Sequence, residues 1–175
     1  MIEFSRVWAM PNKHTFTIPP ITSLLKRYVG SGKDWADPFA NSNSPAEWTN
    51  DLNPDTESQF HLDALEFCQI LPDDSLSGVL FDPPYSLRQM KEVYNSIGID
   101  KLPYEHTIRF YGECRRILSS KVVLGGLAIS FGWNSIGMTK KYGFEPIEIM
   151  LVCHGRAHND TIVTVEMKCR DALNG

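Results

Sequence analysis

Apolar positions that recur every three or four residues predict amphipathic helices in five segments of the chain. These segments are 21–29, 63–71, 85–98, 106–118 and a short one at 134–143. Gly30 follows the first segment, as expected of a helix that ends at a glycine. Two pairs have the spacing of a helix cap: Asp63 with Glu66, and Ser86 with Gln89.

Short apolar runs between these segments predict strands. They are 34–39, 46–52, 78–81, 125–133, 146–154 and 161–168. The run 78–81 contains no polar side chain, which is typical of a strand buried on both faces. The double glycine at 125–126 indicates a turn at the start of its segment.

Strands that alternate with helices predict an α/β fold, with a mostly parallel sheet covered by helices on both faces. No helical segment separates the last two predicted strands, so one of them should be antiparallel. The chain shows no internal repeat and no low-complexity linker. We therefore expect residues 1–175 to form a single domain, with the loop-rich segment 30–54 inside it.

Composition narrows the class of protein. The chain has 175 residues, of which 42% are hydrophobic and 22% charged, as is ordinary for a globular protein. No apolar run approaches the ~20 residues that cross a bilayer, and the first residues do not resemble a signal peptide. The four cysteines are widely spaced, which favours reduced thiols in a cytoplasmic protein over a disulfide framework or a zinc site.

The formal net charge of −4 argues against nucleic-acid binding through a broad, positively charged surface. Basic side chains could make local contacts only. The candidates are Arg88, Lys91, Lys140, Lys141 and Arg156.

Acidic residues stand at four successive positions where predicted strands end or helices begin: Asp37, Asp51, Asp63 and Asp82. Ligands of open α/β sheets bind outside the carboxyl ends of the strands. Any one of these acids could simply cap a helix. Asp51 follows Asp37 by about fourteen residues, close to the distance at which an acid meets ribose hydroxyls in nucleotide-binding sheets.

The strand 78–81 runs into Asp82-Pro83-Pro84-Tyr85. This D-P-P-Y sequence resembles the signature of S-adenosylmethionine-dependent amino-methyltransferases, chiefly those that act on adenine in DNA. Further segments are similar to the family's other motifs in the same order: "KHTFTIPPI", "WADPFANSN", "TNDLNP", "HLDAL" and "GGLAISFGW". The segments "FGWNSIGM" and "CHGRAHNDTIVTVE" are similar to small stand-alone adenine methyltransferase-like proteins of phages.

The resemblance implies a Rossmann-like class I methyltransferase fold with a seven-stranded sheet whose last strand is antiparallel. Two departures stand out. Asn41 and Asn43 occupy positions where the family has glycines, and asparagine is the residue that otherwise best tolerates positive φ. The chain also lacks the inserted target-recognition domain that most sequence-specific DNA methyltransferases carry.

The resemblance further implies S-adenosylmethionine as the cofactor. The residues assigned to its binding are Phe16, Pro19, Asp37, Pro38, Phe39, Asp51, Asp63, Ala64 and Asp82. Asp51 would accept hydrogen bonds from the ribose, and Asp63 from the cofactor's adenine. Phe16 and Pro19 would cover the methionine part, although core packing explains them equally well.

The catalytic residues implied are Asp82, Pro83, Pro84 and Tyr85. The Asp82 carboxylate and the Pro83 carbonyl would each accept one hydrogen of an exocyclic amine, and proline fixes the direction of that carbonyl. Tyr85 would stack on the target base, which would have to be flipped out of a duplex. The alternative is a Pro-Pro turn followed by an incidental tyrosine. No metal is needed for this chemistry.

Substrate contacts are expected from the end of the fifth predicted strand and from the last hairpin. The residues are Trp133, Asn134, Arg156, His158 and Asn159. Trp133 could instead anchor the core, and the hairpin could be a plain turn.

The sequence thus predicts an adenine-specific DNA methyltransferase that binds DNA weakly on its own, helped by a homodimer or a separate recognition partner. Cytosine, RNA and a glutamine amide remain open as acceptors. The alternative function is a degenerate methyltransferase fold that binds cofactor, nucleic acid or a protein partner without turnover.

Overall fold

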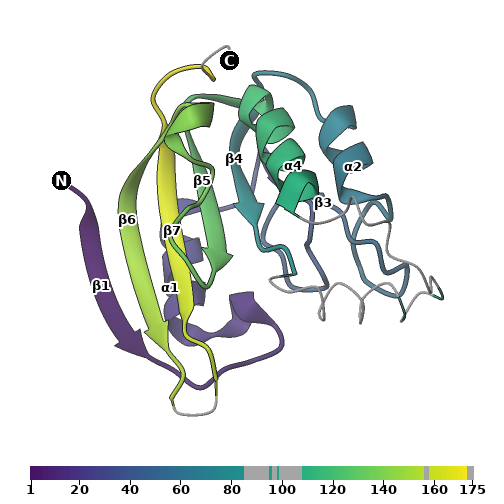
Figure 1. The fold of residues 1–175 in the computed structure, drawn as a ribbon. Coiled ribbons are helices and arrows are strands. Elements are labelled where there is room, and N and C mark those ends of the chain that lie inside the picture. The colour runs from purple at the N-terminus through teal and green to yellow at the C-terminus, as the bar shows by residue number, and fades with distance from the viewer. Residues whose placement is uncertain (85–94, 96–97, 99–107, 156–157, 173–175) are drawn as a thin grey trace.

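A computed structural model describes residues 1–84, 95, 98, 108–155 and 158–172. These residues form a seven-stranded sheet with the order β1-β6-β7-β5-β4-β2-β3 (Figure 1). The strands are β1 Glu3–Trp8, β2 Trp35–Asp37, β3 Trp48–Thr49, β4 Leu76–Phe81, β5 Val122–Gly132, β6 Phe144–Cys153 and β7 Thr161–Lys168. The helices are α1 Pro19–Tyr28, α2 Ala64–Ile70 and α4 Ile108–Lys121, with 3-10 turns at Thr15–Thr17 and Lys140–Tyr142.

The strand directions confirm the predicted mixed sheet. β7 runs antiparallel to both neighbours, β5 and β6, and the other strand pairs are parallel. All strands except β7 therefore end at the same edge, which we call the carboxyl edge.

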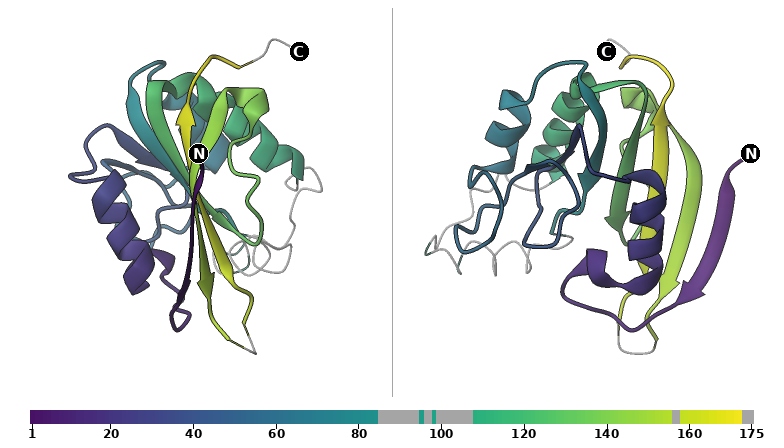
Figure 2. Two further views of the ribbon diagram at one scale, coloured as in Figure 1. Left: turned by 90° about the vertical axis from the view of Figure 1, so that its left-hand side faces the viewer. Right: turned by 180° about the vertical axis from the view of Figure 1, so that it is seen from behind.

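Helices cover both faces, also as predicted: α1 lies on one face, and α2 and α4 lie on the other (Figures 1 and 2). Each face has its own apolar core. The first is centred on α1 and on inward side chains of β4 to β7, including Ile21, Leu24, Leu80, Ile129, Val152 and Val163. The second lies beneath α2 and α4 and includes Phe67, Phe81, Cys114, Leu118, Ala128 and Phe144.

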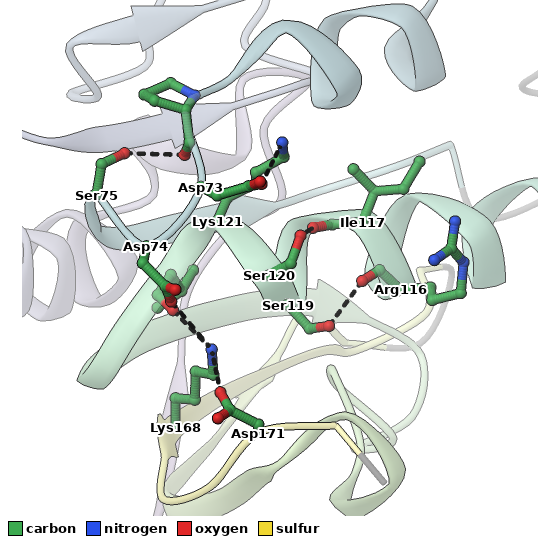
Figure 3. Close-up of polar contacts among 12 residues, drawn as sticks. Asp73, Asp74, Ser75, Arg116, Ile117, Ser119, Ser120, Lys121, Lys168 and Asp171 are labelled. Atoms are coloured by element: carbon green, nitrogen blue, oxygen red, sulfur yellow. Dashed lines mark hydrogen bonds and ion pairs between the residues drawn. The ribbon is translucent and has the colours of Figure 1, made fainter. Parts of the chain in front are cut away.

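The end of the sheet opposite the carboxyl edge is fixed by two buried lysines. The Lys168 ammonium donates to the Val122 carbonyl at 2.9 Å and pairs with Asp171 at 3.3 Å. The Lys121 ammonium lies 2.6 Å from Asp73 (Figure 3). Buried charges persist only when they are paired and hydrogen-bonded. These contacts therefore join β7 to the start of β5, and the end of α4 to the turn before β4.

Two predictions of local structure are wrong. No helix spans 134–143, because Gly137 (φ 56°) and Thr139 (φ 76°) have left-handed backbones that interrupt helical geometry. Only Lys140–Tyr142 forms a 3-10 turn. The glycines 125–126 do not begin β5 either; they lie within it, where its register against β4 shifts.

Strand β1 was missed by the sequence analysis. It pairs with β6 in parallel at the edge of the sheet, from Glu3 opposite Glu148 to Trp8 opposite Cys153. Its sequence EFSRVW mixes charged and apolar residues, so it lacks the apolar run of an interior strand. The predicted helix 85–98 lies outside the described residues apart from Asn95 and Gly98.

All four cysteines are free thiols; Cys68, Cys114 and Cys153 are buried and Cys169 is exposed. Among the described residues, no helix combines the length and apolar character of a membrane span.

Candidate active site

The end of β2 is organised around a buried carboxyl group. Asp37 is fully buried and accepts hydrogen bonds from the Phe39 amide at 3.0 Å and the Ser44 hydroxyl at 2.7 Å. Its backbone carbonyl accepts from the Asn50 amide. Asp37 therefore shapes the loop that follows β2 and ties it to β3.

Asp51 links that loop to the one after β3. Its two carboxylate oxygens accept backbone hydrogen bonds, Oδ1 from Asn53 and Oδ2 from Asn41, each at 2.9 Å. Asn41 has a φ of 50°, so it takes the left-handed backbone that glycine would supply in the family. Asn41 thus takes the positive φ that asparagine was expected to tolerate, and its effect on cofactor binding stays a prediction. Asn43 is exposed, and its amide lies 3.1 Å from a ring nitrogen of His14.

Asp63 caps α2, as its sequence position predicts: its Oδ1 accepts from the Leu65 amide at 2.9 Å. Ala64 is buried beneath the helix. Between β3 and α2, Phe60 forms an isolated parallel bridge with Asn50, so a short additional extended segment lies beside β3. Asp63 consequently sits at the carboxyl edge beyond β3.

Asp82 follows β4 at the same edge and is half-buried. Burial raises the pKa of its carboxyl to about 7, opposed by a hydrogen bond from the Thr15 hydroxyl. Pro83 is buried and Pro84 half-buried. Tyr85, the fourth residue of the predicted catalytic motif, lies outside the described residues.

Asp37, Asp51 and Asp82 are close enough to interact. Burial is the main cause that raises the pKa of Asp37 to about 7, and the negative charges of Asp82 and Asp51 raise it further. The structure therefore brings together three of the four acids that the sequence singles out.

The aromatic residues near the site pack mainly against one another. The Phe39 ring meets the Phe81 ring edge-on at 5.5 Å and the Tyr111 ring at 6.0 Å. Phe16 is buried against Phe131, with 5.0 Å between ring centroids. These contacts give Phe16 and Phe39 a packing role, and their contact with a cofactor stays a prediction.

Pro19 is exposed as the first residue of α1, and Pro38 is buried in the turn after β2. The contact of both residues with a cofactor stays a prediction.

The predicted substrate residues lie further along the carboxyl edge. Trp133 is 47% exposed after β5, and the Asn134 side chain accepts from the Ile136 amide at 3.0 Å in a local turn. His158 and Asn159 are exposed in the β6–β7 hairpin, whereas Arg156 lies outside the described residues.

His154 is a structural residue. One of its ring nitrogens lies 2.8 Å from the Ala9 carbonyl and the other 2.9 Å from the Thr161 hydroxyl, so both are occupied. In the described part of the chain, no three His, Cys, Asp or Glu side chains converge as metal ligands.

Glu166, which the sequence analysis missed, holds the loop after Trp133. Its carboxylate is buried and accepts from the amides of Met138 at 2.5 Å and Thr139 at 3.2 Å. Burial raises the pKa of this carboxyl to about 7. The sequence did contain a signal for Glu166, because an acid at an inward-facing position of an otherwise apolar strand is unusual.

Thr15 was also missed, because a threonine in a polar segment carries no signal of its own. We expect Thr15→Val to move the acidic limb of the pH–rate profile upward by about half to one pH unit. The hydroxyl stabilises the Asp82 anion and so lowers its pKa; removing it raises the pKa, and the carboxylate then forms at higher pH. The measurement is kcat/KM against pH for both proteins.

Thr17→Val is the matched control, since Thr17 lies in the same 3-10 turn and its hydroxyl bonds to the His14 carbonyl instead. Equal limbs for wild type and Thr15→Val would show that Thr15 does not tune Asp82.

No family model and no curated protein matches this sequence. Solved structures do match its fold. TrmN from Thermus thermophilus aligns with a TM-score of 0.57 and 16% identity over 87% of this chain and 49% of TrmN, so the chain spans about half the length of that protein. The Burkholderia thailandensis 1,6-didemethyltoxoflavin-N1-methyltransferase, solved with S-adenosylhomocysteine, aligns with a TM-score of 0.57 and 11% identity over 86% of this chain and 77% of its own.

Escherichia coli yhhF gives a TM-score of 0.53 and 11% identity over 91% of this chain and 90% of its own. The fold is the Rossmann-like fold of methyltransferases. At these identities the likeness concerns the fold alone.

Proposed function

We propose that this chain binds S-adenosylmethionine and transfers its methyl group to the exocyclic 6-amino group of adenine in DNA. The observation that carries the proposal is the position of Asp82. Its half-buried carboxyl follows β4, is succeeded by two prolines and lies near Asp37 and Asp51. A partly buried acid with a raised pKa at the ligand-binding edge of an α/β sheet is a candidate functional group. The S-adenosylhomocysteine of a structural neighbour supports the choice of cofactor for this chain.

The residues at the carboxyl edge suit this cofactor. It carries a positive sulfonium, and the acids Asp37, Asp51 and Asp82 lie close together where we expect it to bind. Each oxygen of Asp51 accepts one backbone hydrogen bond and, because a carboxylate oxygen can accept two, keeps capacity for a ribose hydroxyl. Asn41 has a left-handed backbone, and we expect the turn it makes to let the loop approach the cofactor.

The methyl group arrives already activated, so the protein's main work is alignment, which contributes up to about 7–11 kcal/mol. The adenine amino nitrogen is a weak nucleophile because its lone pair is delocalised into the ring. An Asp82 carboxylate and a Pro83 carbonyl that each accept one amino hydrogen favour a pyramidal nitrogen with its lone pair directed at the methyl group. Asp82 must be ionised for this role, and its pKa of about 7 places that ionisation near neutral pH.

The direct test incubates the protein with S-adenosylmethionine labelled in the methyl group and, in separate reactions, with unmethylated DNA, unmethylated RNA and a protein extract. We expect label in DNA, recovered as 6-methyladenine after digestion to nucleosides. Label in RNA or protein alone would assign another acceptor, and cofactor binding without any transfer would favour the degenerate alternative.

Asp51→Ala is expected to weaken cofactor binding about ten- to a hundredfold. The change removes a charged acceptor worth ~1.5–3 kcal/mol and also frees the loops that Asp51 ties through Asn41 and Asn53. Titration calorimetry with S-adenosylhomocysteine gives the affinity.

Asp55→Ala is the control, since Asp55 is an exposed acid in the same loop. Equal affinity of Asp51→Ala and wild type would reject this placement of the ribose.

A further inference from the structure

An open surface depression of about 450 Å³, which we call the cavity, lies at the ends of β1 and β6, beside the β6–β7 hairpin. Its lining includes Arg6, Trp8, Cys153, His158, Asn159 and Asp160. The volume is within the range of small-ligand sites. β1 contributes two of these side chains, and neither has a part in the active site described above.

The geometry of the sheet directs the β1 side chains into this cavity. Arg6 and Trp8 are two residues apart on one strand and so share a face. Trp8 lies opposite Cys153 in the register with β6. On this face α2 and α4 cover the other half of the sheet, and no described helix lies in front of β1 (Figure 1). Trp8 is 66% exposed, so its indole is accessible from solvent.

The polar groups of the cavity include both donors and acceptors. The Arg6 Nε lies 3.3 Å from the Cys153 sulfur, which fixes one side of the guanidinium. Asp160 accepts from the His154 amide at 3.0 Å, and its charge lies near Arg6. An arginine partly balanced by a carboxylate is a poor site for a bare phosphate. The arginine, the carboxylate and the Asn159 amide together offer donors and acceptors for the edge of a nucleobase. The exposed indole offers a surface on which the face of the base can stack.

The cavity lies along the same edge as Asp82. From β4 to β1 there are four strand steps, or roughly 19 Å at ~4.8 Å per step. Trp133, 47% exposed after β5, lies between the two ends of this row. A nucleotide strand whose target base is at Asp82 could therefore place a flanking base at Trp8.

We propose that Arg6, Trp8, Asn159 and Asp160 form a pocket for an unpaired base of a single-stranded nucleic acid, on the same edge of the sheet as the site that receives the target base and four strands away from it. This inference rests on the proposed function only in taking nucleic acid as the substrate. A net charge of −4 makes stacking a better source of affinity than phosphate contacts. Base stacking needs an unpaired strand, so the pocket selects single strands over duplexes.

The test is fluorescence anisotropy of a dye-labelled 12-nucleotide single strand, in DNA and RNA versions, without cofactor. We expect Trp8→Ala to weaken binding about tenfold, which corresponds to ~1.4 kcal/mol of stacking. Trp8→Phe keeps an aromatic face and should recover much of the affinity, while Arg6→Gln should weaken binding several-fold. The labelled duplex of the same sequence should bind more weakly than the strand.

Phe4→Ala is the matched control. Phe4 lies on the same strand and face, is equally exposed at 66% and does not line the cavity. Its loss should leave oligonucleotide affinity unchanged. Equal losses for Phe4→Ala and Trp8→Ala, together with a change in molar mass by light scattering, would assign this face to contact with a second copy and overturn the pocket.

The outcomes also separate this inference from the proposed function. Strand binding that depends on Trp8, without methyl transfer to DNA, would leave the pocket standing and refute the proposed activity. Methyl transfer to DNA with no effect of Trp8→Ala or Arg6→Gln on strand affinity would refute the pocket alone. The DNA and RNA strands show which sugar the pocket accepts.

Discussion

Asp82→Ala is expected to reduce methyl transfer to adenine by about 10²–10⁴-fold while leaving cofactor affinity within a few-fold of wild type. The carboxylate is proposed to accept a hydrogen of the target amine and to favour the pyramidal nitrogen that can attack, a contribution of the size that positioned acid–base groups make. It is not proposed to hold the cofactor's sugar or base. Single-turnover rates with saturating cofactor, combined with calorimetry, measure both quantities.

Asp82→Asn separates charge from shape, because asparagine keeps an acceptor oxygen but cannot ionise. Its remaining activity should lose the rise with pH that Asp82 gives the wild type near pH 7. An active Asp82→Ala protein would refute the catalytic assignment. A variant that no longer binds cofactor would show that Asp82 acts on the cofactor side of the site.

Asp37→Asn is expected to remove a pH-dependent loss of stability: relative to wild type, the variant should gain up to about 2.6 kcal/mol between pH 5 and pH 8. The folded-state pKa of Asp37 is raised from 3.8 to about 7, so the native state holds this proton more tightly than the unfolded chain. The contribution of Asp37 to stability is therefore full below about pH 4 and is lost as pH rises through about 7. Asparagine keeps the shape and the bond to the Phe39 amide but has no proton to lose.

The measurement is urea unfolding of both proteins at pH 5 and pH 8. Comparing the two pH values cancels hydrogen-bond changes that do not depend on pH. Asp73→Asn is the control. The hydrogen bond with Lys121 lowers the pKa of the Asp73 carboxyl, so this group is already ionised at both pH values and its loss should not change the difference between them. Parallel pH dependences for Asp37→Asn and wild type would mean that Asp37 is not titrating in the folded protein.

The fold was largely predictable because interior strands carry an unambiguous signal. The apolar run at 78–81 predicted a strand buried on both faces, and β4 is buried along most of its length. The two final segments without a helix between them predicted antiparallel pairing, which β6 and β7 show. Asp63 was predicted as a cap from its position alone.

The failures follow from interactions between residues distant in sequence. Segment 134–143 has helical spacing, yet Glu166 on another strand binds the amides of Met138 and Thr139 and holds the loop in a non-helical path. β1 is an edge strand, where solvent accepts polar side chains and the apolar pattern weakens. The acids of the site could be predicted because they follow the ends of predicted strands. Thr15 acts through a single contact with Asp82, which no spacing of residues in the sequence indicates.

The position of β7 sets an order of events for a chain emerging from the ribosome. Among the strands of this sheet β7 is synthesised last, yet it lies between β5 and β6. Until it arrives, β6 has only β1 as a partner, and the two halves of the sheet are not joined. Because pairing of this kind closes long loops, it is slow. We therefore expect nascent chains that stop before Thr161 to expose unpaired strand edges and to depend on chaperones, even though the residues that form the proposed catalytic site have all been made.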